Sequence, residues 1–457
     1  MFRNLFVNRL PELSFLEKRW SEDKAQLVVI VGRRRVGKTE LIRRFIASKP
    51  GVYFLADASP LDKQLQRFSA MVEHATHQTL PRTATSWADV LCALANEEKR
   101  ILAIDEFGYM VERDQTILSE FQRAWDEKIQ ESRLFIIICG SSVSLMENEV
   151  LGVKSPLYGR RTGYWRLDPL GFSEIRHFFP RYTIDDLART YMSVGGIPAY
   201  LSKFDADIDF WANMEAKLLN RGDFLYDEPE FLLRTELREP YSYFGIVEAA
   251  AKGKVKLNDI STHAKIEVRS LPKYIQVLQR LAVLEKVTPV GERKMKTHRY
   301  AYRVKDHFLA FWFRYVYPHK DLLELGNTEQ VMQNIRRDFD SYAGPRFEDI
   351  ALQTILASDP GLVVNEHGKW WSGQTEIDLV FLEKKNGKYT KGSFFEVKWS
   401  SLTNKHASRY LTELEDKVKN FPFRLKEKKL GLFARQVENT KQLRREGYLI
   451  FELQNTQ

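Results

Sequence analysis

Few cysteines, no long apolar run and no internal repeat mark this sequence, and each absence excludes a class of protein. Cys92 and Cys139 are the only cysteines in 457 residues, and neither has a cysteine or histidine near it at metal-ligand spacing. We therefore expect no disulfide framework and no zinc site, and a reducing compartment. The strongest apolar run, Leu134–Cys139, is far shorter than the ~20 residues that span a bilayer. The N-terminus lacks the apolar stretch of a signal peptide. These features predict a cytoplasmic protein with no membrane partner.

The composition is that of a globular protein with a positive charge balance. Hydrophobic residues make up 44% and charged residues 29%, and the length suits about three domains. The formal net charge of +9 is a mild argument for a polyanionic partner such as nucleic acid. A soluble protein with lysine-rich surfaces has the same composition, so this observation does not choose between the two.

The first half of the chain alternates short apolar runs with longer helical patterns. Such alternation predicts an α/β fold in which helices cover both faces of a parallel sheet. The expected strands are Gln26–Val31, Gly51–Ala56, Ile101–Ile104 and Leu134–Cys139. The expected helices include Glu40–Ser48 and Gln115–Gln130, and a mostly helical stretch follows from about Phe172 to Glu239.

One loop in this region has the residues of a phosphate-binding loop. Gly32–Thr39, with the letters GRRRVGKT, fits G-x-x-x-x-G-K-[ST] between an expected strand and an expected helix. Gly32 and Gly37 would let backbone N–H groups face the phosphates, at the positive end of a helix. Lys38 would neutralise the β- and γ-phosphates, and Thr39 would ligate Mg²⁺. The motif predicts a nucleoside triphosphatase.

Two further strand ends carry polar groups suited to the same reaction. Asp105 and Glu106 follow an apolar strand; Asp105 would hold Mg²⁺ through water, and Glu106 would orient or deprotonate the attacking water. The alternative is a helix cap and a solvated acid. Ser141 or Ser142, after the next strand, would sense the γ-phosphate, or else would cap the helix that follows.

On these residues, the segment from Phe6 to about Tyr200 resembles the AAA+-related ATPases of archaea and some bacteria, close to the signal-transducing ATPase branch. The segment around Asn8 and Arg9 is similar to the family's element beside the adenine. The motif Gly195–Leu201 (GGIPAYL) resembles the family's lid motif, in which Pro198 would touch the base. The resemblance implies that the nucleotide is ATP.

The same resemblance extends to an arginine element. The segment LYGRR, residues 157–161, is similar to the element before the last core strand of these ATPases. It implies that Arg160 or Arg161 is an arginine finger on the γ-phosphate of the same or a neighbouring subunit, because a permanent cation offsets charge on phosphate oxygens. A surface arginine paired with an acid is the alternative. A finger that acts between subunits would require a homo-oligomer.

The pattern from Leu257 to Val304 predicts a winged helix. An amphipathic helix at Leu271–Leu281 would leave three polar side chains on its outer face, Arg269, Lys273 and Gln276. The hairpin after it would carry the basic residues Arg293, Lys294, Lys296, His298 and Arg299. This is a form that binds DNA, although winged helices in this ATPase family also act as intramolecular brakes. The aromatic run Phe308–Tyr317 is expected to be core.

The C-terminal region has a new α/β pattern with a set of acids and one lysine. A helix is expected at Arg337–Ala357, strands at Thr375–Glu383 and Gly392–Trp399 around an Asn386-Gly387 hairpin turn, a helix at Leu402–Asn420, and strands at Leu430–Ala434 and Tyr448–Leu453. Strand alternation puts Glu376 with Asp378, and Glu396 with Lys398, on shared faces. Carboxylates that converge in this way, together with Glu348, favour a Mg²⁺ or Mn²⁺ site that cleaves phosphodiesters.

This pattern resembles the PD-(D/E)xK nuclease superfamily, particularly its Holliday-junction-resolvase-like branch. The resemblance covers about Arg346 to Ala434, and it implies that the site consists of Glu348, Asp378, Glu396 and Lys398, with Asp378 and Glu396 as metal ligands. Ile377 stands where the superfamily usually has proline. A solvated charged hairpin, or a nuclease fold that binds DNA without cutting, would show the same letters.

The predicted fold class is α/β: a P-loop NTPase parallel sheet with a helical lid, a winged helix and a C-terminal restriction-endonuclease-like domain. The predicted divisions are 1–170 for the ATPase core, 171–240 for the lid, 241–318 for the winged helix, 319–335 for a linker and 336–457 for the nuclease-like domain. We predict an ATP-regulated, metal-dependent DNA endonuclease. The alternative is a non-cleaving ATPase switch that binds DNA or a protein.

Overall fold

The computed structural model divides the chain into two compact units. It describes residues 6–96, 98–237, 240–292, 299–358 and 362–455. The first unit contains Met1–Pro169 and Ile197–Ala199, and the second contains Leu170–Gly196 and Tyr200–Gln457. The first unit ends within one residue of the predicted ATPase core. No helix in the described ranges has the length and apolar character needed to cross a membrane.

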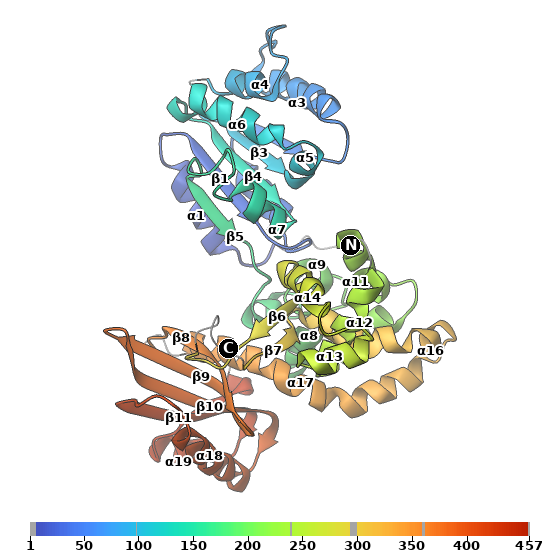
Figure 1. The fold of residues 1–457 in the computed structure, drawn as a ribbon, viewed down its shortest axis with the longest axis vertical. Helices are drawn as coiled ribbons and strands as arrows, with labels where there is room; N and C mark the ends of the chain where they lie inside the picture. Colours follow the sequence, from blue (N-terminus) through green and yellow to red (C-terminus); the bar gives the residue numbers. More distant parts are fainter. Residues whose placement is uncertain (1–5, 97, 238–239, 293–298, 359–361, 456–457) are drawn as a thin grey trace. The chain divides into compact units, whose positions relative to one another are not determined.

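The first unit is built on a parallel sheet, as the sequence predicts (Figure 1). Its order is β2-β3-β4-β1-β5, so β4 separates the strand before the glycine-rich loop from the strand that ends in Asp105. The strands are β1 Gln26–Val31, β2 Gly51–Leu55, β3 Ile101–Asp105, β4 Phe135–Gly140 and β5 Gly163–Arg166. The helices are α1 Leu10–Trp20, α2 Lys38–Ile46, α3 Leu61–Thr76, α4 Trp87–Leu94, α5 Gly108–Arg113, α6 Thr116–Glu127 and α7 Val143–Leu145, with a one-turn π-helix at Met146–Val150.

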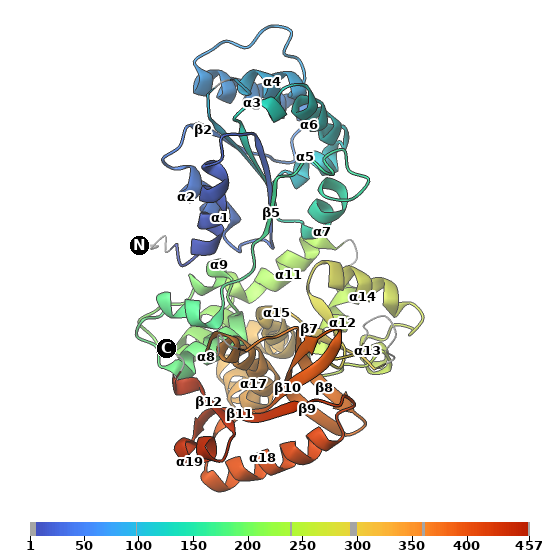
Figure 2. The same cartoon turned by 90° about the vertical axis from the view of Figure 1, so that its left-hand side faces the viewer.

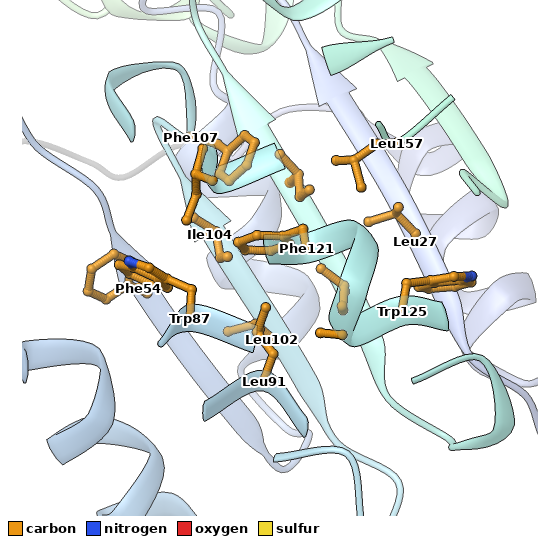
Figure 3. Close-up of a cluster of buried hydrophobic side chains, with 14 of the residues drawn as sticks. Leu27, Phe54, Trp87, Leu91, Leu102, Ile104, Phe107, Phe121, Trp125 and Leu157 are labelled. Atoms are coloured by element: carbon orange, nitrogen blue, oxygen red, sulfur yellow. The ribbon is translucent and has the colours of Figure 1, made fainter. Parts of the chain in front are cut away.

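Strand alternation gives this sheet two buried faces. Val28 and Ile30 of β1 pack with α1 and α2, whereas Leu27 and Val29 pack with α3, α4 and α6. Figure 3 shows part of the second cluster, in which Phe54 and Trp87 lie beside strand residues such as Ile104. Both faces are therefore covered, which explains why the three central strands, β1, β3 and β4, are buried along their whole length.

The second unit begins with the predicted helical stretch. The elements after β5 are η3 Phe172–His177, α8 Ile184–Val194, α9 Pro198–Leu201 (whose first two residues group with the first unit), α10 Phe210–Asn213, η4 Met214–Leu219 and α11 Phe224–Glu236. Three helices and a two-stranded antiparallel sheet follow in the predicted order: α12 Pro240–Ala251, α13 Leu257–Ala264, α14 Leu271–Arg280, β6 Leu284–Val287 and β7 Ala301–Val304. The hairpin residues Arg293, Lys294, Lys296 and His298 lie outside the described residues.

The predicted linker at 319–335 is wrong. The chain there forms α16 Lys320–Glu324 and then the first turns of α17 Thr328–Ser358, after α15 His307–Phe311, η5 Trp312–Val316 and η6 Tyr317–His319. Val331, Met332 and Ile335 are buried, so this segment is packed helix. The long helix also continues through Pro345. In the aromatic run Phe308–Tyr317 every residue except Arg314 and Tyr317 is buried, which confirms its assignment to the core.

The C-terminal half of this unit is a mixed sheet of order β12-β11-β10-β9-β8. Its elements are β8 Glu366–Ser372, β9 Thr375–Lys385, β10 Lys388–Leu402, α18 Asn404–Lys419, β11 Glu427–Val437, α19 Thr440–Arg445 and β12 Leu449–Glu452. Asn386 and Gly387 both have positive φ, the two-residue turn that their sequence predicts. Figure 2 shows α17 and α18 on opposite faces of this sheet. Strand β8 was not predicted.

Candidate functional site

The glycine-rich loop joins the end of β1 to the start of α2, as its motif requires. Gly37 adopts a φ of 100°, which other residues rarely do. A Cβ atom on Gly32 would lie 2.5 Å from the carbonyl oxygen of Leu167, so a larger residue does not fit there. Lys38 is buried, and its Nζ donates to the carbonyls of Gly32 at 2.8 Å and Arg33 at 2.9 Å. The loop thus holds its ammonium group within its own curve, where the motif binds phosphate.

Thr39 and Asp105 meet across the intervening strand β4. The Thr39 hydroxyl donates to Asp105 Oδ2 at 2.5 Å, and the Tyr53 hydroxyl donates to the same oxygen at 2.8 Å. Asp105 is fully buried. A hydroxyl beside a carboxylate is an oxygen donor set that fits Mg²⁺. Tyr53 was not predicted, because nothing in β2 indicates which strand lies beside it.

Glu106 and Ser141 are also brought together. Ser141 donates to Glu106 Oε2 from its hydroxyl at 2.6 Å and from its backbone at 3.3 Å. Glu106 has a φ of 54°, an uncommon conformation for a side chain of this size. Ser142 precedes α7 without a side-chain capping bond. The serine after β4 therefore controls where the candidate general base points.

Arg9 holds the glycine-rich loop in place through hydrogen bonds. Its guanidinium donates to the Val36 carbonyl at 3.0 Å, the Asp168 carbonyl at 2.9 Å and Glu12 Oε1 at 3.1 Å. Two of these bonds go to backbone carbonyls and the third to a carboxylate, so the side chain holds protein segments together, which is a different role from the predicted contact with the base. A contact between Asn8 and adenine stays a prediction.

The start of the lid motif lies against the chain that follows β5. Leu170 N–H donates to the Gly196 carbonyl at 2.8 Å, and Pro198 begins α9. Ile197–Ala199 group with the first unit, whereas the flanking residues group with the second. The predicted contact of Pro198 with the base stays a prediction.

The two candidate arginine fingers lie at the other edge of the parallel sheet. Arg166 pairs with Val31 at the carboxyl edge, and Arg161 precedes it by five residues, which is up to about 16 Å of extended chain. Arg160 forms a bidentate pair with Asp126, at 2.6 and 2.7 Å. For Arg160, the pair with Asp126 matches the alternative of a surface arginine paired with an acid, and a finger role of either arginine, in the same or a neighbouring subunit, stays a prediction.

The predicted acids and lysine of the C-terminal sheet converge. Phe395 pairs with Leu379, which sets Glu396 opposite Asp378, and Asp378 Oδ2 accepts the Val397 N–H at 2.9 Å. Lys398 Nζ lies 2.7 Å from Glu396 Oε1 and 3.5 Å from Asp378 Oδ2.

Two lysines that were not predicted complete this carboxylate–lysine cluster. Lys417 of α18 donates to Glu396 Oε2 at 2.8 Å. Lys369 of β8 bridges Glu348 Oε1 at 2.8 Å and Glu376 Oε1 at 2.7 Å. Both come from elements whose position beside the acids is a tertiary property.

The charge balance of the cluster is incomplete around Glu348. Burial raises the pKa of Glu348 to about 7; Lys369 opposes this, and the negative charge of Asp378 adds to it. Among the described residues, no three carboxylate, imidazole or thiolate groups are already arranged around one metal position. The donors are oxygens, as Mg²⁺ and Mn²⁺ prefer, and Asp378 and Glu396 are the two that would hold such an ion.

The three-helix segment exposes the polar side chains predicted for its outer face. Arg269, Lys273 and Gln276 are exposed, while Ile275 and Leu278 are buried. The base of the hairpin packs on strand β8: the Val290 N–H donates to the Lys369 carbonyl at 2.9 Å. Val290 also belongs to the apolar cluster of the C-terminal sheet.

Two family models match the chain. Residues 6–204 match an ATPase domain predominantly from Archaea. Residues 312–410 match a family described as "Archaea bacterial proteins of unknown function". The P-loop and its parallel sheet are therefore an archaeal-type ATPase domain.

Individual proteins are similar over different lengths. The uncharacterized protein MJECL04 of Methanocaldococcus jannaschii is 31% identical over 439 residues, which are 95% of this chain and 97% of that protein. The uncharacterized ATP-binding protein MJ0423 of the same organism is 58% identical over 45 residues, 10% of this chain and 76% of that protein. The Walker-type ATPase PABY2304 of Pyrococcus abyssi has a similar fold, with a TM-score of 0.51 and 22% identity, over 68% of this chain and 97% of that one.

Proposed function

The chain belongs to the same family as MJECL04 and carries an archaeal-type ATPase domain. We propose that it is an ATP-regulated, metal-dependent DNA endonuclease. The observation that carries the nuclease part is the convergence of Asp378, Glu396 and Lys398 on neighbouring strands, with Glu348 nearby. A pair of opposed carboxylates with a lysine is better explained by a role in phosphodiester hydrolysis than by a purely structural role in the sheet.

The chain's own residues have separate roles in this proposal. Asp378 and Glu396 would hold a divalent ion, which supplies a Lewis acid for water activation. Lys398 would donate a hydrogen bond to the attacking water or to the charge that develops on the phosphate. Lys369 and Lys417 hold Glu348 and Glu396 in place when no substrate is bound.

In the ATPase domain, Lys38 would bind the β- and γ-phosphates, and Thr39 and Asp105 would hold Mg²⁺. Glu106 would orient the attacking water after it exchanges its bond to Ser141. Exposed Arg269 and Lys273 would contact DNA backbone through the winged helix. ATP would then govern how the second unit meets DNA.

A specific observation favours a second function. Three lysines already pair with Glu348 and Glu396, and no third carboxylate stands at the metal position among the described residues. A regulatory ATPase whose C-terminal sheet only binds DNA or a protein would need only these ion pairs and no metal site.

A cleavage assay separates the two functions. Supercoiled, linear, single-stranded and branched DNA are incubated with Mg²⁺ or Mn²⁺, with and without ATP. We expect cutting by the wild type and none by Asp378→Asn, whereas Glu383→Gln, on the same strand but away from the cluster, should cut normally.

Lys38→Ala then reports whether ATP controls cutting. If the wild type hydrolyses ATP but cuts none of these substrates, the nuclease proposal fails and the regulatory switch replaces it. Equal cutting by Asp378→Asn and the wild type would trace the activity to a contaminant.

A further inference from the structure

Positive charge is concentrated at one end of the C-terminal sheet. Residues 383–391 and 424–429 contain eight lysines and arginines and two glutamates, a formal charge of +6 against +9 for the whole chain. Two thirds of the net charge therefore lies in two short segments. Like charges this close repel one another, and a partner of opposite sign would relieve that repulsion.

The two segments form one surface. The first is the β9–β10 hairpin, and the second leads into β11, which pairs with β10 so that Lys428 lies opposite Gly392. The Lys426 N–H donates to the Thr390 carbonyl at 2.8 Å, which joins the segments before the strand pairing begins. Backbone pairing thus fixes the spacing of the cations.

Five of these cations form what we call the basic rim: Lys385, Lys388, Arg424, Lys426 and Lys428. All five are exposed. Lys384, Lys391 and Lys429 pair with Glu366, Glu383 or Glu427, but no rim side chain has an ion pair with any carboxylate in the part of the chain that the structure describes. Among the residues that the structure describes, the charge of the rim is thus not compensated by an ion pair.

The position of the rim matches a nucleic-acid duplex. Lys388 and Glu396 lie eight residues apart on β10, which is about 26 Å of strand. At 3.4 Å per step, this distance corresponds to about eight base pairs. A duplex held by the carboxylate–lysine cluster would reach the rim in less than one helical turn.

Nearby contacts favour the same partner. The Gly291 N–H, at the base of the predicted wing, donates to Glu366 Oε1 at 2.8 Å, and Glu366 also accepts from Lys384 of the hairpin at 3.4 Å. The wing base therefore lies at the rim end of the sheet. The hairpin tip is Asn386-Gly387 and carries no apolar side chain for insertion into a lipid surface.

We propose that the basic rim binds the phosphate backbone of a nucleic-acid duplex that extends from the carboxylate–lysine cluster. This inference rests on the proposed function for the far end of the duplex. The rim adds a phosphate contact outside the catalytic and winged-helix residues, and it sets the direction in which the duplex crosses the sheet.

Salt dependence of binding measures the rim directly. Full-length protein in the Asp378→Asn background, with chelator present, is titrated against a labelled duplex at several salt concentrations. Five rim contacts would contribute about −4.5 to the slope of log K against log salt, so Lys426→Gln/Lys428→Gln should make the slope shallower by about 1.8. Lys426→Arg/Lys428→Arg should restore it, because charge is what matters.

The matched control is Lys405→Gln/Lys441→Gln, two exposed lysines near the other end of the same sheet. We expect its slope to equal that of the parent. ATP hydrolysis should be unchanged in both glutamine variants, which shows that the first unit is folded. An unchanged slope in the rim variant overturns the proposal, as does an equal loss in the control.

Other polyanions test the identity of the partner. Polyglutamate and vesicles with anionic headgroups replace the duplex as competitors. If the rim variant loses more affinity for either competitor than it loses for the duplex, the nucleic-acid assignment is overturned. Because binding is measured without cutting, a rim-dependent slope stands even if the wild type never cleaves DNA. If the wild type cleaves DNA but the rim variant has an unchanged salt slope, the rim proposal fails and the proposed nuclease function stands.

Discussion

Replacement of Arg9 by methionine tests whether this residue builds the phosphate-binding loop or touches the nucleotide. In the structure its guanidinium joins three segments through bonds to Val36, Asp168 and Glu12. Methionine keeps much of the aliphatic volume but removes the charge and every donor. The loop should then lose the group that anchors the residue before Gly37.

The magnitude follows from the burial of the pair. The Arg9 and Glu12 side chains are 9% and 11% exposed, so loss of Arg9 leaves an unpaired carboxylate largely out of water. Loss of one partner of a buried pair costs about 3–5 kcal/mol. Domain stabilities are about 5–15 kcal/mol, so this is a large fraction. Arg9→Met/Glu12→Gln should recover much of the loss, because the orphaned charge is gone.

The assay is denaturant unfolding without nucleotide, followed by ATP titration of the folded protein. We expect Arg9→Met to lower the unfolding midpoint of the first unit before any ATP is added. Arg44→Met, which removes an exposed arginine of α2, serves as the control and should change little. Unchanged stability without nucleotide, combined with weaker ATP binding, would refute the structural role and favour contact with the base.

Three further outcomes are expected. Tyr53→Phe removes one of the donors to buried Asp105 and should lower kcat for ATP about tenfold, with a higher Mg²⁺ requirement in steady-state hydrolysis; an unchanged Mg²⁺ curve would contradict this. Burial raises the pKa of Glu348 from 4.5 to about 7 in the folded protein, so between these two pH values the folded state keeps a proton that the unfolded state releases. The free energy of unfolding should therefore fall by about 3 kcal/mol as pH rises from 4.5 to about 7. Glu348→Gln should flatten the fall between about pH 5 and about pH 8 in chelator, and parallel curves would count against it. Arg161→Ala should slow ATP hydrolysis only at concentrations where subunits associate; equal loss on dilution would mean that it acts within its own subunit.

Features that depend on one residue's backbone or on a short pattern were predictable from the sequence. Gly37 and the Asn386-Gly387 turn need positive φ, a requirement that the residue type itself reveals. Three of the four predicted strands of the first sheet, β1, β3 and β4, were found because fully buried parallel strands are continuous apolar runs. The alternation on β9 and β10 indicated that Asp378, Glu396 and Lys398 share a face, because successive side chains of a strand point to opposite faces.

Features that depend on a distant partner were not predictable. Strand β8 has a glycine and several polar residues, and its pairing with β9 is what makes it a strand. The segment at 319–335 was expected to be a linker, and its helices form because residues such as Val331 and Ile335 find a core to enter.

The sequence by itself determined the loop, the strands and the identity of the acids, since each is encoded by neighbouring residues. The tertiary structure alone decided which groups meet: Tyr53 with Asp105, Arg9 with the loop carbonyls, and Lys369 and Lys417 with the cluster. Periodicity shows which side of an element faces inward, but not which element it will face. That choice depends on sheet order and helix packing, which are set by long-range burial.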